Sequence, residues 1–406
     1  MITKKEVVDK IAYITMQFPV PSETFASNDI DALSKYGCVV DVYGLRVKHK
    51  DHKKLIVERK LKKLYIDNFN IKSIASFFFV VARYPHVFIS LISWIFNTCR
   101  FEFKHLIKSF ILLPSVLSIF LGLKKNNYDV VHLFWGHYPS MVGFLVKKYL
   151  PDVVVSTFLG AHDLIARYPG SLYISKLADC CFTHSADNLN ILNKYGFDSD
   201  RFVVVNRGTK IFTFGDNNKF ENLKNIRILT ASRLIKEKGV GDVLQVFSAL
   251  LEFYPEANLI IAGEGPYKEE LKNQAIRLGV MDKVNFLGHV SQSELIVEMH
   301  QSHIFILMSK YEGERLPNVV KEAMLQKCFT ITTDTVGIRE LIPSDKYGLV
   351  VDQCDVSRVI TETLNLLGQP CVMQNIAQQG AVYIKENFDV DKMMRKYLDE
   401  WNAVNK

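Results

Sequence analysis

Two successive series of short β-rich runs, each followed by a stretch of helical period, constrain the fold of this chain more than any other feature. In the first half, the runs cover residues 11–15, 38–44, 129–134, 153–157, 181–184 and 202–205. In the second half, they cover residues 226–231, 258–262, 284–287, 304–308, 329–332 and 348–351. Short apolar runs separated by helices are typical of parallel strands covered on both faces. The sequence therefore predicts two α/β units in tandem.

The polar stretch 206–225 separates the two series. It contains Gly208, Gly215 and a cluster of Asn, Lys and Asp residues, which is typical of a linker. We expect an N-terminal domain over 1–205, a linker over 206–225, a second domain over 226–385 and a final helical segment over 386–406. Because ligands of open parallel sheets bind beyond the carboxyl ends of the strands, we expect a site in a cleft between two facing sheets.

Composition excludes several classes of protein. Hydrophobic residues make up 48% and charged residues 23% of the 406 residues, which indicates a well-packed globular protein and argues against disorder. The seven cysteines are scattered without metal-ligand spacing, and residues 1–10 are polar, so we expect reduced thiols and a cytoplasmic location without a signal peptide. The longest uncharged apolar runs, 87–99 and 109–123, are shorter than the roughly 18 to 20 residues of a spanning helix, so no span is predicted.

The positive charge is concentrated in residues 48–63. This segment holds eight Lys or Arg residues against Asp51 and Glu58, a local excess of six in a chain of net charge +7. Such a segment can rest on an anionic membrane surface. A solvated loop or helix face is the alternative interpretation. Nucleic-acid binding is not expected, because no nucleic-acid-binding motif accompanies the basic residues.

Glu314 and Glu322 lie on either side of a predicted turn-to-helix junction at Pro317. Proline favours the first helical position, so Glu314 is expected in the preceding loop and Glu322 about one turn into the helix. The helix start formed by Pro317, Asn318 and Val319 offers backbone amides and a positive dipole end, which suit a phosphate. Carboxylates that bind hydroxyls next to a phosphate site are what a nucleotide sugar requires.

Two further motifs follow predicted strands of the second series. Arg233 and Lys238 come after residues 226–231, where a basic pair can clamp a diphosphate and offset charge as it leaves, although strand-end Arg and Lys are commonly plain surface residues. Gly263 and Gly265 follow residues 258–262 and form half of a dinucleotide fingerprint. Because Lys268 occupies the third glycine position, we expect a tight turn close to a nucleotide rather than a nicotinamide site.

Taken in order, these motifs resemble the donor half of family 4 retaining glycosyltransferases over about residues 225–355. The resemblance implies the GT-B fold, which has two Rossmann-like domains facing a central cleft and a C-terminal helix that packs towards the first domain. It also implies that Arg233 and Lys238 hold the donor diphosphate, that Glu322 bonds the ribose hydroxyls and that Glu314 contacts the transferred sugar. Arg315 stands where the family usually has glycine, and Val336-Gly337 replaces its usual Gly-Gly pair.

The first domain resembles the family more loosely. Residues 18–25 are similar to a loop of members that build bacterial extracellular polysaccharides, and this places Ser22, Glu23 and Thr24 on the acceptor side. Ser22 and Thr24 can also cap the next helix, and an ordinary capping turn is the alternative.

Two histidines follow predicted strands of the first domain. Many relatives have a His-Gly-x-Asp arrangement near the position of His162 and Asp163, although here Gly160 precedes the histidine. We therefore expect His162, Asp163 and His137 at the cleft, with His162 among the catalytic residues. A histidine in the core or at a cap is the alternative for each.

No metal or cofactor is expected. Asp-x-Asp pairs occur at 29/31, 198/200 and 389/391, but none follows a strand as a metal-bridging pair for a diphosphate would. Arg233, Lys238 and helix amides would then neutralise the leaving group.

The expected function is transfer of a sugar, with retention, from a nucleotide sugar to a lipid-linked glycan in cell-surface polysaccharide biosynthesis. The expected location is cytoplasmic and peripheral on the inner face of the cell membrane. The alternatives are a nucleotide-sugar epimerase or hydrolase of GT-B type and a non-catalytic partner in a polysaccharide-assembly complex. A nicotinamide oxidoreductase is a remote further alternative, because Lys268 interrupts the fingerprint.

Overall fold

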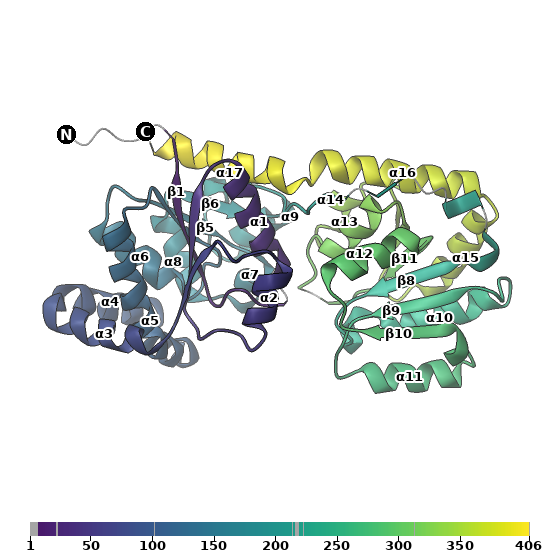
Figure 1. Ribbon diagram of the computed structural model, residues 1–406, viewed down its shortest axis with the longest axis horizontal. Helices are drawn as coiled ribbons and strands as arrows, with labels where there is room; N and C mark the ends of the chain where they lie inside the picture. Colours follow the sequence, from purple (N-terminus) through teal and green to yellow (C-terminus); the bar gives the residue numbers. More distant parts are fainter. Residues whose placement is uncertain are drawn as a thin grey trace. The chain divides into compact units, whose positions relative to one another are not determined.

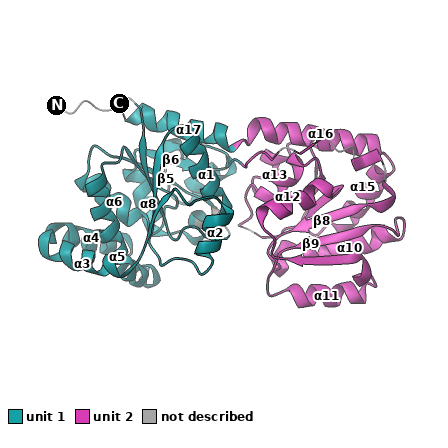
Figure 2. Ribbon diagram, viewed as in Figure 1, with its two compact units in different colours: residues 1–208, 390–406 teal, residues 209–389 magenta. Residues whose placement is uncertain are grey.

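The computed structural model describes residues 7–21, 23–100, 102–212, 214–215, 219–221, 223–311 and 313–405, but not the side chains of Ala161 and His162. The chain forms two compact units, which Figure 2 shows in different colours. Unit 1 comprises the residues up to Gly208 and those from Val390 onward, and unit 2 comprises Thr209–Asp389. The boundary between the two units, between Gly208 and Thr209, lies within the polar stretch 206–225.

Unit 1 is built on a seven-stranded parallel sheet with the order β3-β2-β1-β4-β5-β6-β7. Its strands are β1 (Lys10–Thr15), β2 (Val39–Gly44), β3 (Tyr65–Asn68), β4 (Val130–Leu133), β5 (Val154–Phe158), β6 (Cys180–Thr183) and β7 (Phe202–Val204). Strand β1 is buried on both faces, because its alternate residues enter different hydrophobic clusters: Ala12 and Ile14 enter one, Ile11 and Tyr13 the other.

Helices cover both faces of this sheet (Figure 1). They are α1 (Thr24–Lys35), α2 (His52–Glu58), α3 (Ile71–Arg83), α4 (Pro85–Thr98), α5 (Phe103–Asn126), α6 (Ser140–Tyr149), α7 (Ala161–Ala166), α8 (Pro169–Leu177), α9 (Asp187–Lys194) and the C-terminal α17 (Val390–Val404). Helix α17 packs against α1, where Lys35 forms an ion pair with Asp391 at 3.0 Å. Its buried stripe includes Tyr397 and Trp401, and the ring of Tyr397 lies 4.0 Å from that of Phe182. The predicted return of the C-terminal helix to the first domain is confirmed.

Unit 2 repeats the architecture with a six-stranded parallel sheet of order β10-β9-β8-β11-β12-β13. Its strands are β8 (Arg227–Ala231), β9 (Asn258–Ala262), β10 (Val284–Gly288), β11 (Ile304–Leu307), β12 (Phe329–Thr333) and β13 (Leu349–Val351). Its helices are α10 (Val240–Leu251), α11 (Lys268–Arg277), α12 (Gln292–Gln301), α13 (Asn318–Leu325), α14 (Ile338–Leu341), α15 (Val356–Leu367) and α16 (Pro370–Asn387). The two Rossmann-like sheets confirm the predicted fold, and all twelve predicted strands are present within one or two residues.

Two expectations about unit 1 were wrong. The sequence did not predict β3, because this four-residue edge strand, Tyr65–Asn68, follows directly on the basic segment and is half polar. The uncharged runs also underestimated the length of α5, which has 24 residues. Among the described residues, α5 is the one single helix that is long and apolar enough to cross a membrane, judged by length and composition alone. Half of its most apolar window is buried within the protein, as in the core helix of a globular unit.

Candidate active site

The carboxyl edge of the unit 2 sheet has a topological switch point between β8 and β11, which are neighbours in the sheet but lead to helices on opposite sides. Ligands of open α/β sheets bind outside such a point. The loop after β8 carries Arg233 and Lys238, and the loop after β11 carries Ser309, Tyr311 and Glu314. Three of the residues that the sequence singled out for the donor, Arg233, Lys238 and Glu314, therefore lie on the two loops that meet at this point.

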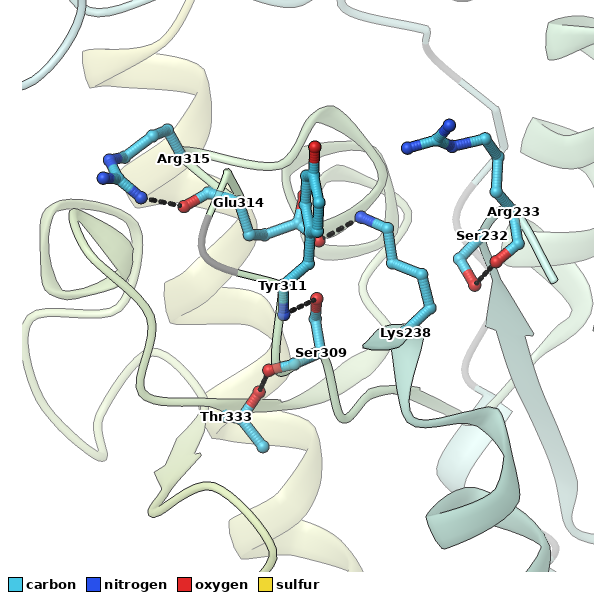
Figure 3. A network of polar contacts seen from close by, with 8 residues as sticks. All are labelled: Ser232, Arg233, Lys238, Ser309, Tyr311, Glu314, Arg315 and Thr333. Atoms are coloured by element: carbon cyan, nitrogen blue, oxygen red, sulfur yellow. Dashed lines mark hydrogen bonds and ion pairs between the residues drawn. The ribbon is translucent and has the colours of Figure 1, made fainter. Parts of the chain in front are cut away.

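Lys238 and Glu314 form an ion pair across these two loops (Figure 3). Each side chain is only 12% exposed, so water screens the pair weakly. The Lys238 ammonium also lies 5.2 Å from the centre of the Tyr311 ring. Arg233 is exposed, and its guanidinium points towards the side on which Lys238 and Tyr311 lie (Figure 3). Two cations and a carboxylate are thus available at one edge of the sheet.

Gly239 allows the two loops to approach each other. It has a φ of +67°, and a Cβ at this position would lie 1.8 Å from the carbonyl oxygen of Met308, the residue after β11. Only glycine fits such a conformation at such a distance. The close approach places the short 3₁₀ turn Lys236–Lys238 beside the β11 loop.

Two further contacts fix these loops, and sequence reasoning missed both. Lys310 donates its backbone N–H to the Glu237 carbonyl at 2.7 Å and forms an ion pair with Asp242 at 2.6 Å. The hydrogen bond to Asp242 is the main cause of a raised Lys310 pKa. The position of Lys310 directly after a predicted strand was a usable signal, but the position of Asp242 in the next helix was not.

The glycine pair Gly263 and Gly265 has a packing role in the structure. A Cβ on Gly263 would lie 1.8 Å from the Ser232 carbonyl oxygen, and one on Gly265 would lie 2.2 Å from that of Leu234. The Leu234 N–H also donates to the Glu264 carbonyl at 3.0 Å. The glycines therefore seat the β9 loop against the loop that carries Arg233, and their contact with a nucleotide stays a prediction.

Glu322 is buried on α13 and accepts a hydrogen bond from Gln292 Nε2 at 2.7 Å. Burial raises the pKa of its carboxyl, and the Gln292 hydrogen bond and the charge of Lys321 oppose this shift. The structure thus gives Glu314 and Glu322 separate partners. Pro317 is the N-cap of α13 and not its first helical residue, because the backbone at Pro317 is extended, with a ψ of 127°. Asn318 and Val319 therefore supply the first amides of the helix.

The acceptor-side residues of unit 1 are mostly enclosed. Glu23 accepts a hydrogen bond from Trp135 Nε1 at 3.3 Å, and burial raises its pKa. Glu23 is also the N-cap of α1 without a side-chain cap bond, and Thr24 is the first helical residue, so the predicted capping by Thr24 was wrong. Ser22 and the side chain of His162 lie outside the described residues.

Asp163 is fully buried, although we expected it at the cleft. Its carboxylate accepts hydrogen bonds from Ser171 Oγ at 2.9 Å and from the Gly160 N–H at 3.3 Å, and the backbone of Gly136 and His137 also bonds to it. Burial is the main influence on this carboxyl and raises its pKa to about 7. Asp163 therefore holds the loops after β4 and β5 and is a positioning residue.

His137 is buried as well, and its Nδ1 accepts a hydrogen bond from the Tyr138 N–H at 2.8 Å. It lines a cavity of about 20 Å³ together with His105 and Tyr168, which is room for about one water molecule and not for a sugar.

Sequence reasoning also missed Arg59 and Arg207. Arg59, counted above within the basic segment, donates to the carbonyl oxygens of Pro21 at 3.0 Å and Glu23 at 3.3 Å, so it holds the 18–25 loop. Arg207, taken as part of the linker, stacks on Phe25 at 3.8 Å and on Phe158 at 4.5 Å. Neither position carried a sequence signal beyond its charge.

Within the described residues, no group of three or more His, Cys, Asp or Glu side chains is placed to hold a metal ion. Metal independence stays a prediction.

Comparisons with known proteins agree with this geometry. Residues 214–381, which include every unit 2 residue discussed above, match the sequence model of the family Glycosyl transferases group 1. An uncharacterized glycosyltransferase of Haemophilus influenzae is 23% identical over 295 residues, covering 72% of this chain and 75% of the relative. The alpha-monoglucosyldiacylglycerol synthase of Streptococcus pneumoniae is 30% identical over 267 residues, covering 59% of this chain and 60% of the relative.

Among solved structures, Anabaena HepE in complex with UDP superposes with a TM-score of 0.71 at 14% identity, covering 96% of this chain and 98% of HepE. At this identity the likeness shows the fold alone. The matched family, the relatives, the fold and the charged residues at the unit 2 switch point together identify the chain as a retaining glycosyltransferase of group 1, with the GT-B fold, that transfers a sugar from a nucleotide donor.

Proposed function

We propose that this glycosyltransferase takes its sugar from a UDP-sugar and adds it to a lipid-linked glycan during assembly of a cell-surface polysaccharide. The observation that carries the proposal is the Lys238–Glu314 ion pair at the switch point of unit 2, with the exposed Arg233 on the same β8 loop as Lys238. HepE, which has this fold, was solved with UDP and with UDP-glucose. The Streptococcus pneumoniae relative is named for a glucosylated diacylglycerol, which supports a lipid acceptor.

The ion pair explains how the cation that would bind a diphosphate is held in place before the donor arrives. Without donor, Glu314 compensates the charge of Lys238 at a position that water screens weakly. A bound diphosphate competes for Lys238 and Arg233, because phosphate oxygens form strong charge-assisted bonds with both side chains. Glu314 is then released to accept hydrogen bonds from the hydroxyls of the transferred sugar.

In the transfer step, the bond between the anomeric carbon and the diphosphate oxygen breaks, and a bond to the acceptor oxygen forms on the same face. Lys238 and Arg233 stabilise the negative charge that develops on the departing diphosphate. The family resemblance implies that the leaving phosphate oxygen takes the acceptor's proton.

We place the enzyme in the cytoplasm, at the inner face of the cell membrane. The support is the segment 48–63, in which the described lysines at 48, 50, 53, 54, 60, 62 and 63 are all exposed. Arg59 is partly buried and bound to the 18–25 loop, so it does not contribute to such a surface. Replacing Lys53, Lys54, Lys62 and Lys63 with Gln should weaken binding to anionic vesicles, and unchanged binding would leave 48–63 as a solvated surface.

A thermal-shift screen against UDP, GDP, ADP and their sugars tests the donor. Binding at 100 times Kd stabilises the folded state by about 2.7 kcal/mol, so the proposal predicts a clear rise in the midpoint with UDP and UDP-sugars. A flat response to all nucleotides would contradict it. Release of free sugar and UDP without consumption of any acceptor would instead support a hydrolase or epimerase.

A further inference from the structure

Helices α3, α4 and the N-terminal half of α5 carry an exposed apolar surface, the apolar face. Figure 2 shows these helices as an outer layer of unit 1, away from its strands. The most exposed of its large side chains are Ile71, Phe78, Ile89, Phe103, Ile107 and Ile111. Phe96 of α4 and Phe110 of α5 join the two helices with ring centres 5.6 Å apart. A cluster of exposed apolar side chains on one face of a folded protein indicates a binding surface.

Helix α5 shows how the apolar face is anchored. Between residues 103 and 111 four of its apolar side chains are exposed, with Phe103 at 77% and Ile111 at 69%, and only Leu106 packs against the core. From Leu112 to Leu123 the same helix lies in the hydrophobic core of unit 1, where it packs against Tyr43 and other core residues. A membrane-spanning orientation of α5 would remove this half from the core. The helix can therefore meet an apolar phase only along its surface.

Charged residues around the apolar face are almost all basic. Between residues 71 and 111 the chain has Lys72, Arg83, Arg100, Lys104 and Lys108 against the single acid Glu102, and all six are exposed. Lys104 and Lys108 lie one position after Phe103 and Ile107, so a basic stripe runs beside the apolar stripe along α5. Long basic side chains beside an apolar stripe can reach phosphate headgroups while the stripe enters the acyl boundary.

The same composition argues against a protein as the occupant. Protein interfaces are enriched in aromatic residues and Arg but depleted in Lys. Three of the five exposed basic residues around the apolar face are Lys. At an anionic bilayer, each basic residue near the surface strengthens binding about fivefold. Charge and apolar area thus favour the same partner.

We infer that the apolar face docks on an anionic lipid bilayer, with α3 and the N-terminal half of α5 lying in the plane of the headgroup region. This inference extends the proposed membrane location and rests on it in part. Helices α3–α5 are the part that inserts into the bilayer surface, and segment 48–63 supplies only long-range electrostatic attraction.

Vesicle flotation with phosphatidylglycerol–phosphatidylcholine vesicles tests the inference. The variant Phe103→Ser, Ile107→Ser, Ile111→Ser should bind on the order of tenfold or more weakly than the wild type. Its matched control is Phe253→Ser with Ile276→Ser in unit 2, where the side chains are 64% and 62% exposed, and it should bind like the wild type. Lys104→Gln with Lys108→Gln should weaken binding to these vesicles but not to pure phosphatidylcholine. Wild-type binding by the triple variant would overturn the inference.

A second measurement needs no variant. Hydrogen–deuterium exchange of the wild type should slow in 71–83 and 103–111 when vesicles are added, and unchanged exchange there would overturn the inference. Size-exclusion chromatography adds one more outcome. A wild-type dimer that the triple variant converts to monomer, with vesicle binding unaffected, would show that the face joins two copies of the chain, which also overturns it.

The inference and the proposed function can fail separately. The substituted side chains lie outside the donor site, so the triple variant should keep the thermal shift with UDP. Vesicle docking through the apolar face without any nucleotide response would refute the proposed function alone. A nucleotide response without vesicle docking would refute the inference and the membrane location, but not sugar transfer from a UDP donor.

Discussion

The two units use one architecture in opposite ways. Both have a parallel sheet whose fourth strand lies beside its first, so both have a switch point at the carboxyl edge. In unit 2 that edge carries ionic side chains: the Lys238–Glu314 pair joins two loops, and Arg233 is exposed. In unit 1 the same edge carries Arg207 stacked on aromatic rings and the fully buried Asp163.

The difference shows which properties of a Rossmann-like unit are set by the sheet and which by its loops. The strand order brings loops together, and the residues on those loops decide whether the edge holds exposed charge or enclosed rings. A diphosphate needs cations that can turn towards it, and the switch point of unit 2 offers Lys238 and Arg233. Unit 1 instead exposes an apolar face on α3–α5.

The largest expected effect tests whether the charged edge of unit 2 is the catalytic one. Lys238→Ala should lower kcat by about a hundredfold to a thousandfold, roughly 3–4 kcal/mol of transition-state stabilisation, because it removes a cation from the departing diphosphate. The matched control is Lys236→Ala, which removes an exposed cation of the same turn and should leave kcat unchanged. Steady-state kinetics with the donor found in the screen measure both. Wild-type kcat in the Lys238 variant would show that the edge of unit 2 is not the catalytic one.

The next effect tests how unit 2 brings its loops together. Gly239→Ala should destabilise the protein by roughly 3 kcal/mol, because the methyl group adds a clash with the Met308 carbonyl to the strain of a positive φ. Gly279→Ala has a φ of +69° and open space around the new Cβ, so it carries the strain alone, about 1 kcal/mol. Urea denaturation measures both. Equal losses in the two variants would mean that close approach of the loops is not important.

A smaller effect concerns the buried acid of unit 2. Glu322→Gln should raise the donor KM about tenfold, because the ribose hydroxyls lose a charged acceptor. Burial raises the pKa of Glu322, so donor affinity in the wild type should weaken as the pH falls towards that pKa. The variant should show no such dependence. Titration calorimetry with UDP between pH 5 and 8 distinguishes the two, and identical pH profiles would remove Glu322 from the donor site.

The smallest effect concerns the buried acid of unit 1. The unfolded chain loses the Asp163 proton near pH 3.8, whereas the folded state keeps it until about pH 7. The stability that this group contributes is therefore complete below about pH 3.8 and is lost as the pH rises through about 7. The last part of this loss, about 1 kcal/mol, falls between pH 6.5 and 8. Asp163→Asn lowers stability at every pH but should remove this slope. Denaturation at a series of pH values measures it, and an unchanged slope would exclude Asp163 as its source.

The sequence was sufficient for the sheets, because every strand except β3 is an apolar run bounded by helical patterns. It also predicted that Arg233, Lys238 and Glu314 lie at one edge of a sheet, since motifs at strand ends meet where parallel strands end together. Their roles, and that of Glu322, stay predictions. It failed where a role depends on burial. Asp163 and His137 looked accessible in the sequence but are enclosed, and Arg59 looked like a surface charge but holds a loop.

The apolar face shows the same limit. In the sequence, residues 109–123 form one uncharged apolar run, and a linear pattern cannot separate the exposed half of α5 from its buried half. Only the packing of α5 against the core of unit 1 makes that distinction.

The most direct test of the central claim is a crystal structure of the protein with an intact UDP-sugar. The account predicts the diphosphate between Arg233 and Lys238, with the Lys238–Glu314 pair opened and the Glu314 carboxylate bonded to sugar hydroxyls. A nucleotide bound at the edge of unit 1, or one bound to unit 2 while Lys238 remains paired with Glu314, would contradict it.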